Sequence, residues 1–122
     1  MVADAQLSSI VAEVVALGPG RPPRIIASSP WLEGTELARL RLHTSMSEVF
    51  SAALLTCSHV LGAPQQNAHD SPPSWYPECI QFASWPAGQG LVYLAVVHHD
   101  KETPVLLEFG VVSAPEVAAR EA

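Results

Sequence analysis

The sequence predicts an α+β fold, in which a five-stranded antiparallel sheet is packed by a central amphipathic helix and an N-terminal helix. Two segments carry apolar residues at helical spacing, and five short segments have the composition or alternation of strands. The last three strands follow one another through short connections, which is typical of neighbouring antiparallel strands. The expected order of elements is α-β-β-α-β-β-β-α, with the helices packed on one sheet.

Length and composition limit the class of protein. The chain has 122 residues, of which 48% are hydrophobic and 15% are charged, and its net charge is -6. A chain of this length forms one domain, so residues 1–122 are expected to share one fold. The high apolar content and the two cysteines exclude a disordered tail, a collagen and a disulfide scaffold. An acidic chain with a single lysine also lacks the basic surface that binding to nucleic acid requires.

The chain is expected to be soluble and cytoplasmic. Its first twenty residues lack the basic start and unbroken apolar stretch of a signal peptide, and no apolar run approaches the length of a membrane span. Cys57 and Cys79 have no close spacing that would indicate a zinc or redox motif, so we interpret them as buried or free thiols rather than a disulfide. The excess of arginine over lysine, with abundant Ala, Pro and Val, is typical of a GC-rich bacterial genome such as an actinobacterial one.

The N-terminal segment predicts a helix over residues 4–17. Its apolar side chains recur at helical spacing, and the Gly-Pro-Gly sequence at 18–20 ends it, because glycine adopts the left-handed terminal conformation and proline cannot continue a helix. Two short strands, at 24–28 and 36–43, are then expected to form a hairpin. In the second strand the alternation of residues places three basic side chains on one face, Arg39, Arg41 and His43.

The central helix is predicted over residues 45–61. Ser45 and Glu48 form a capping box, in which each side chain bonds a free amide at the start of a helix. Apolar residues then recur at steps of three and four until Gly62. The following segment, 63–78, contains four prolines and two aromatic residues and predicts a long loop. Loops of this length are uncommon in compact domains and are usually functional lids or disordered.

The last third of the chain, residues 79–112, predicts a meander of three antiparallel strands, and a short helix follows it. The strands are expected at 79–85, 91–98 and 104–112. Residues 91–97 are apolar at every position, and a strand that is apolar on both faces is covered on both faces. Two helices cover one face of such a sheet. The second face therefore meets the N-terminal helix, the aromatic loop, a bound apolar ligand or another subunit, and we expect a homodimer.

Glu108 is the strongest candidate for a catalytic residue. It lies in the middle of an apolar strand, on the same face as Leu106, Gly110 and Val112. An acid in such surroundings is either paired or has a raised pKa, and a raised pKa is how a general acid or base is made. Gly110 would leave room there for a ligand or a bulge. The alternative is an edge strand with Glu108 facing water.

Basic residues provide the next candidates. On their expected strand, Arg39, Arg41 and His43 would hold a carboxylate or phosphate group of the substrate, or pair with Glu108 on a neighbouring strand. The alternative is an ordinary solvated face. His98 is a candidate acid–base group, because histidine titrates near neutral pH. Neighbouring residues of a strand point to opposite faces, so His98 and His99 cannot share one metal ion while the strand continues.

Four aromatic residues are expected to bind substrate in one pocket, with the long loop folded over the sheet: Trp75, Tyr76, Trp85 and Tyr93. The alternative is an ordinary aromatic core with an exposed loop tip. The chain contains no nucleophile elbow, Gly-rich phosphate loop, zinc-protease motif or EF-hand. We therefore expect neither a cofactor nor a metal.

Two hypotheses on function follow. In the first, the chain is a small cofactor-independent enzyme or ligand-binding protein of bacterial natural-product or modified-peptide tailoring. An isomerase, cyclase or lyase of this kind would use acid/base chemistry at Glu108 (cyclisation, isomerisation or conjugate addition) on an apolar small-molecule or peptide substrate. In the second, the chain is a non-catalytic interaction module, such as a chaperone-like, immunity or adaptor protein. The variant Glu108→Gln distinguishes the two hypotheses. It removes turnover if the chain is an enzyme, and it changes the affinity for a protein partner little if the chain is an interaction module.

Overall fold

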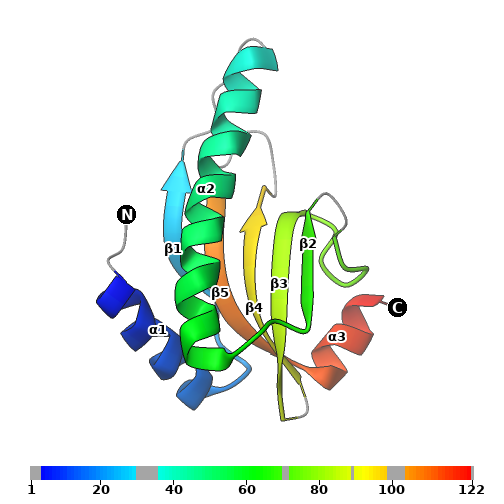
Figure 1. The fold of residues 1–122 in the computed structure, drawn as a ribbon. Coiled ribbons are helices and arrows are strands. Elements are labelled where there is room, and N and C mark those ends of the chain that lie inside the picture. The colour runs from blue at the N-terminus through cyan, green and yellow to red at the C-terminus, as the bar shows by residue number, and fades with distance from the viewer. Residues whose placement is uncertain (1–3, 30–35, 70–71, 89, 99–103, 122) are drawn as a thin grey trace.

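The computed structural model describes residues 4–29, 36–69, 72–88, 90–98 and 104–121. Within these ranges it confirms an α+β fold with a five-stranded antiparallel sheet and three helices (Figure 1). The elements in chain order are α1 (Asp4–Leu17), β1 (Arg24–Ser29), α2 (Glu36–Leu61), β2 (Gln66–His69), β3 (Cys79–Ala87), β4 (Gly90–Val97), β5 (Val105–Ser113) and α3 (Ala114–Glu121). No helix in the described ranges is long and apolar enough to span a membrane.

The sheet is built around the meander of β3, β4 and β5, and its strand order is β1-β5-β4-β3-β2. Each strand pairs antiparallel with its neighbour. Two helices, α1 and α2, lie against the same face of the sheet, and α3 follows β5 at the other side (Figure 1). The apolar strands β4 and β5 are therefore central strands that can be covered on both faces.

The prediction of a strand at 36–43 is wrong, because these residues form the first turns of α2, a helix of 26 residues. The segment consists of Glu, Leu, Ala, Arg and His, without Gly or Pro, and most of these residues favour a helix. The helix therefore continues upstream of Ser45, and the capping-box pattern at Ser45 and Glu48 lies inside it. The hairpin expected with 24–28 does not form, and β1 pairs with β5 instead.

The missing strand is β2, which lies in the segment expected to be a long loop. Its four residues, Gln66 to His69, pair with β3. No β-branched or aromatic residue marks this segment, so pairing with the neighbouring backbone decides its conformation rather than its own propensity. The observed order of elements is α-β-α-β-β-β-β-α, which corrects the expected order.

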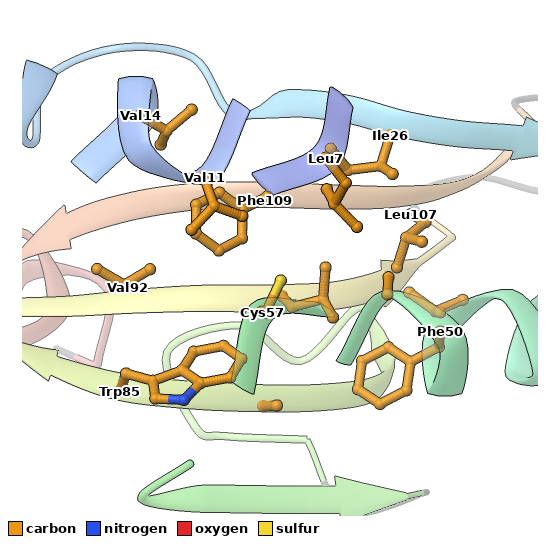
Figure 2. Packing of buried hydrophobic residues seen from close by; sticks show 14 of the residues in the cluster. Leu7, Val11, Val14, Ile26, Phe50, Cys57, Trp85, Val92, Leu107 and Phe109 are labelled. Atoms are coloured by element: carbon orange, nitrogen blue, oxygen red, sulfur yellow. The ribbon is translucent and has the colours of Figure 1, made fainter. Parts of the chain in front are cut away.

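A helix-side core fills the space between the sheet and the helices α1 and α2 (Figure 2). It includes four buried side chains from three different elements, Val11, Phe50, Cys57 and Phe109. Trp85 of β3 also packs here, and its indole Nε1 donates a hydrogen bond to the carbonyl oxygen of Gly62 at 2.8 Å. This bond satisfies one of the free carbonyls at the end of α2 and ties the helix to the sheet.

A loop-side core lies on the opposite face of the sheet. It consists of the buried residues Trp75, Tyr76, Cys79, Phe82, Tyr93, Ala95, Val97 and Val112. The segment 72–78 supplies the two aromatic residues that cover this face, and Val117 of α3 packs against it. The second covered apolar face is therefore present, and the chain itself provides the cover. The homodimer expected from that face gains no support from it, because one chain accounts for the burial.

Candidate functional site

Glu108 lies at the centre of the loop-side face, in the middle of β5. Its side chain is 2% exposed. Its direct partner on β4 is Ala95, which in turn pairs with Phe82 of β3, and both are buried. Strand alternation therefore places Glu108 on the expected face. The alternative of a water-facing acid on an edge strand is wrong, because β5 lies between β1 and β4.

Two tyrosine hydroxyls donate hydrogen bonds to the Glu108 carboxylate. Tyr76, which precedes β3, and Tyr93, on β4, both bond to the same oxygen, Oε1, and the Tyr93 distance is 3.4 Å. Burying a carboxylate is costly unless hydrogen bonds replace the lost water, and bonds to a charged acceptor are stronger than neutral ones. Three separate segments of the chain thus converge on one hydrogen-bonded unit, the Tyr76–Glu108–Tyr93 group.

Both phenols of this group remain protonated near neutral pH. Burial raises the pKa of Tyr76 far above its ordinary value, and its hydrogen bond to Glu108 raises it further. Burial is also the main cause that raises the pKa of Tyr93, with the Glu108 charge adding to it and the Arg120 charge opposing it. Burial, followed by the nearby carboxylates, raises the pKa of the Cys79 thiol as well. The hydroxyls are therefore permanent donors, and Cys79 is not a thiolate nucleophile.

Aromatic rings form the wall beside this group. The Trp75 ring packs edge-on against Phe82 and Tyr93, with centroid distances of 5.6 Å to each. The Tyr76 ring lies 5.5 Å from Trp75 and 5.9 Å from Tyr93. Edge-to-face contacts of this kind are favourable arrangements of aromatic side chains. The expected aromatic loop is therefore ordered against the sheet, with its two aromatic residues buried.

Backbone hydrogen bonds hold the segment 72–78 in place. The amide of Tyr76 donates to the carbonyl of Pro73 at 3.0 Å, which closes a turn. The amide of His98 donates to the carbonyl of Glu78 at 3.3 Å and ties the segment to the end of β4. The prolines restrict φ along the segment, which reduces the entropy lost on ordering it. The Tyr76 ring is thereby directed at the sheet.

Gly110 allows the Tyr93 ring to lie across β5. The two residues are direct partners on β4 and β5. A Cβ at Gly110 would lie 3.0 Å from both Cε1 and Oη of Tyr93, and 3.1 Å from Cβ of Pro23. A side chain there would push the ring aside. The position directly above Gly110 is thus occupied by Tyr93 and Pro23, and the register of β4 and β5 continues through it without a bulge. Gly110 also lines a hollow of about 400 Å³ beside these two residues, so part of the expected room is present.

A cleft opens beside the Tyr76–Glu108–Tyr93 group. Its volume is about 520 Å³, and it is lined by Pro23, Trp75, Tyr76, Pro77, Glu78, Tyr93, Glu108 and Arg120. A neighbouring hollow of about 400 Å³ shares three of these residues, Pro23, Tyr93 and Arg120. Small-molecule sites have volumes of roughly 300–1,000 Å³ and combine apolar walls with a few polar groups. The cleft has this size and this composition.

Arg120 of α3 lies at the cleft, and the sequence alone did not identify it as a site residue. Its guanidinium lies 5.5 Å from the ring centroid of Trp75 and 5.7 Å from that of Tyr76. Its Nη2 also donates to Oε1 of Glu116 at 3.0 Å, one turn earlier on α3. The pair Glu116–Arg120 has the spacing of a helix, but no sequence signal places that helix over the aromatic segment.

Trp85 does not belong to this site, contrary to the sequence expectation. It pairs with Val92, the neighbour of Tyr93, so Trp85 and Tyr93 point to opposite faces. The connection between β3 and β4 is shorter than the expected five residues, since Ala87 already pairs with Gly90. A shift of one residue in register moves a side chain to the other face, which explains why Trp85 packs in the helix-side core.

The strand that was expected to present the basic candidates does not form. Arg39, Arg41 and His43 lie on α2, so the strand face on which they were expected does not exist, and their side chains fall outside the described residues. His98 directly follows β4 and is not among the residues that line the cleft. His99 lies outside the described residues.

The cysteines lie far apart in the fold. Cys57 belongs to the helix-side core and Cys79 to the loop-side core, and both are free and buried. Among the described residues, no three His, Cys, Asp or Glu side chains are placed to hold one metal ion.

The cleft therefore presents one buried carboxylate, two phenols and one guanidinium beside aromatic walls. These groups can exchange a proton with a ligand, donate hydrogen bonds or pair with a charge. The chain matches no protein-family model, no curated protein and no solved structure. Its function is accordingly argued from the cleft alone.

Proposed function

We propose that this protein binds a small molecule or a peptide side chain in the cleft, and that Glu108 transfers a proton to or from that ligand without a cofactor. The observation that carries the proposal is the buried Glu108, held by two tyrosine hydroxyls where it lines the cleft. Tailoring of a bacterial natural product or modified peptide is a setting in which such chemistry would be used.

A purely structural role would not favour an acid at this position. The direct partner of Glu108 is Ala95, and apart from the two tyrosine hydroxyls this face is mainly apolar. An apolar side chain at 108 with phenylalanine in place of the tyrosines would pack there without a charge to desolvate. A buried carboxylate with dedicated hydrogen-bond donors, located in a cleft, is a common arrangement for acid/base groups. This contrast supports a functional reason for Glu108.

The geometry supports proton transfer in particular. The two hydroxyls bond to a single carboxylate oxygen, Oε1, and so restrain the orientation of the carboxyl group. Glu108 and both tyrosines are buried, and electrostatic interactions of a group removed from water are stronger than those of a solvated one. Glu108 would act as the base or acid, while Tyr76 and Tyr93 would position it. Isomerisation, cyclisation and conjugate addition each require a proton transfer of this kind.

Hydrogen–deuterium exchange at an acidic C–H bond tests the proposal without knowledge of the substrate. A panel of ketones with acidic benzylic C–H bonds, such as 2-indanone, is incubated with the protein in D2O, and exchange next to the carbonyl is followed by NMR. We expect the wild-type protein to accelerate exchange of the compounds that perturb the Trp75 indole signal. Glu108→Gln should still bind these compounds and should lose the acceleration, while the exposed control Glu48→Gln should retain it. Equal acceleration by all three proteins would exclude Glu108 as the proton-transfer group.

A non-catalytic interaction module is the second candidate. Exposed apolar side chains on α2 favour it, since Leu55 is 64% exposed and Val60 is 45% exposed. Single exposed hydrophobic residues are common on monomeric proteins, so this signal is weaker than the buried acid. In this case Leu55→Glu should abolish binding of a protein partner, whereas Glu108→Gln should leave it nearly unchanged.

A further inference from the structure

We propose that the ligand of the cleft carries a cationic group, a guanidinium or an ammonium, and that Arg120 occupies the position of this group when no ligand is bound. The inference deepens the proposed function and rests on it, because it names the class of ligand that the same cleft takes. It is argued from the aromatic surface, from the charges that line the cleft and from the way α3 is attached.

The aromatic surface of the cleft already holds a cation. The guanidinium of Arg120 lies within 6 Å of the ring centroids of both Trp75 and Tyr76. Cations are attracted to the faces of aromatic rings, and Trp is the strongest partner. The rings are buried and are ordered by their contacts with Phe82 and Tyr93, so the surface does not depend on Arg120 for its shape.

The lining of the cleft carries more acidic than basic side chains among the described residues. The charged residues that line the cleft are two acids, Glu78 and Glu108, and one base, Arg120. A third acid, Glu116, is the salt-bridge partner of Arg120 at the edge of the cleft. If Arg120 moves away, the described residues that line the cleft offer carboxylates to the aromatic surface and no second basic side chain. A ligand with a positive group restores this balance, whereas an anionic ligand would add a further negative charge.

Arg120 is weakly held. It lies on α3, whose eight residues include none that are buried. Its side chain is 40% exposed, and its salt bridge to Glu116 is likewise exposed, at 41% for the partner. Exposed ion pairs and exposed cation–π contacts contribute little each. A ligand that makes the same contacts with fewer rotatable bonds can therefore displace this side chain.

The test compares three probes of similar shape and different charge: phenylguanidinium, the neutral phenylurea and the anionic benzoate. Dissociation constants come from NMR titrations that follow the Trp75 indole signal. The proteins are the wild type, Arg120→Gln and the matched control Arg21→Gln, which removes the same charge from an exposed residue that lines the neighbouring hollow but not the cleft. Thermal unfolding of each variant verifies that the fold is retained.

We expect phenylguanidinium to bind more tightly than the other probes, and to gain about three- to tenfold in affinity in Arg120→Gln. Arg21→Gln should change its affinity by much less. The inference is overturned if benzoate or phenylurea binds best, if both variants show the same gain, or if Arg120→Gln weakens phenylguanidinium. Tight binding of a neutral or anionic probe in the cleft would overturn only this inference. If none of these probes perturbs Trp75 while a ketone still undergoes exchange that depends on Glu108, only this inference fails. If neither the probes nor the ketones perturb Trp75, the proposed function fails together with it.

Discussion

Replacing Gly110 with alanine tests whether close packing between β4 and β5 positions the site. The new Cβ would lie 3.0 Å from two atoms of the Tyr93 ring system and 3.1 Å from Pro23, whereas carbon atoms in favourable contact are about 3.5–4.0 Å apart. Overpacking of this kind costs about 1–3 kcal/mol, and alanine recovers roughly 0.5–1 kcal/mol relative to glycine in a strand. Gly110→Ala should therefore lower the free energy of unfolding by about 0–2.5 kcal/mol.

The assay is urea unfolding followed by circular dichroism, and a double-mutant cycle with Tyr93→Leu provides the control. The leucine removes the ring atoms that the new Cβ meets, so Gly110→Ala should cost at least about 1 kcal/mol less in that background. If alanine at Gly110 has the same cost in both backgrounds, the glycine does not accommodate Tyr93. A more stable Gly110→Ala variant in the wild-type background would refute the reasoning directly.

Other predictions concern the hydroxyls, the helix end and the thiols. Tyr76→Phe should lower the free energy of unfolding by about 1.5–3 kcal/mol in urea, because it removes a hydrogen bond to a carboxylate, and Tyr93→Phe should cost less because its bond is long at 3.4 Å. Folding raises the pKa of both phenols above their ordinary value of 10.0. The stability that the two hydroxyls contribute is therefore complete below about pH 10 and is lost as the pH rises further. Above that pH the urea midpoint should fall in the wild type, and it should fall less in the variant with both tyrosines replaced by Phe. Trp85→Phe should cost about 1–2 kcal/mol, because a carbonyl at the end of α2 loses its donor, and a cost near zero in urea would contradict that role. Burial raises the pKa of Cys57 to about 12, so the thiol should react with a disulfide reagent at neutral pH only where urea unfolds the chain.

Local patterns were sufficient for several elements and for most of the site. The helix at 4–17 has its periodicity and its Gly-Pro-Gly ending within one short segment, and α1 covers the same range. The position of Glu108 on the loop-side face follows from alternation along a single strand, which needs no knowledge of the partner strands. The aromatic segment was identified by its length and composition, and both of its aromatic residues line the cleft.

The incorrect predictions concern features that depend on neighbouring strands. In segment 36–43 the residue types alternate as in a strand, and most of them also favour a helix. Only the continuation of one helix from this segment to Leu61 decides between the two. The strand β2 has no propensity of its own and exists because β3 offers a free edge. The side of the sheet on which Trp85 lies depends on a turn that is shorter than expected, since one residue of register exchanges the faces.

The sequence alone therefore defined the chemistry that is available: a buried acid, aromatic residues near it, and more apolar surface than two helices cover. The tertiary structure decided which groups meet. It brings Tyr76 and Tyr93 to one oxygen of Glu108, and it places Arg120 over two rings from which it is distant along the chain. The reason is that periodicity reports which face of an element a residue occupies, whereas contacts between elements depend on register and on loop paths, which no local pattern records.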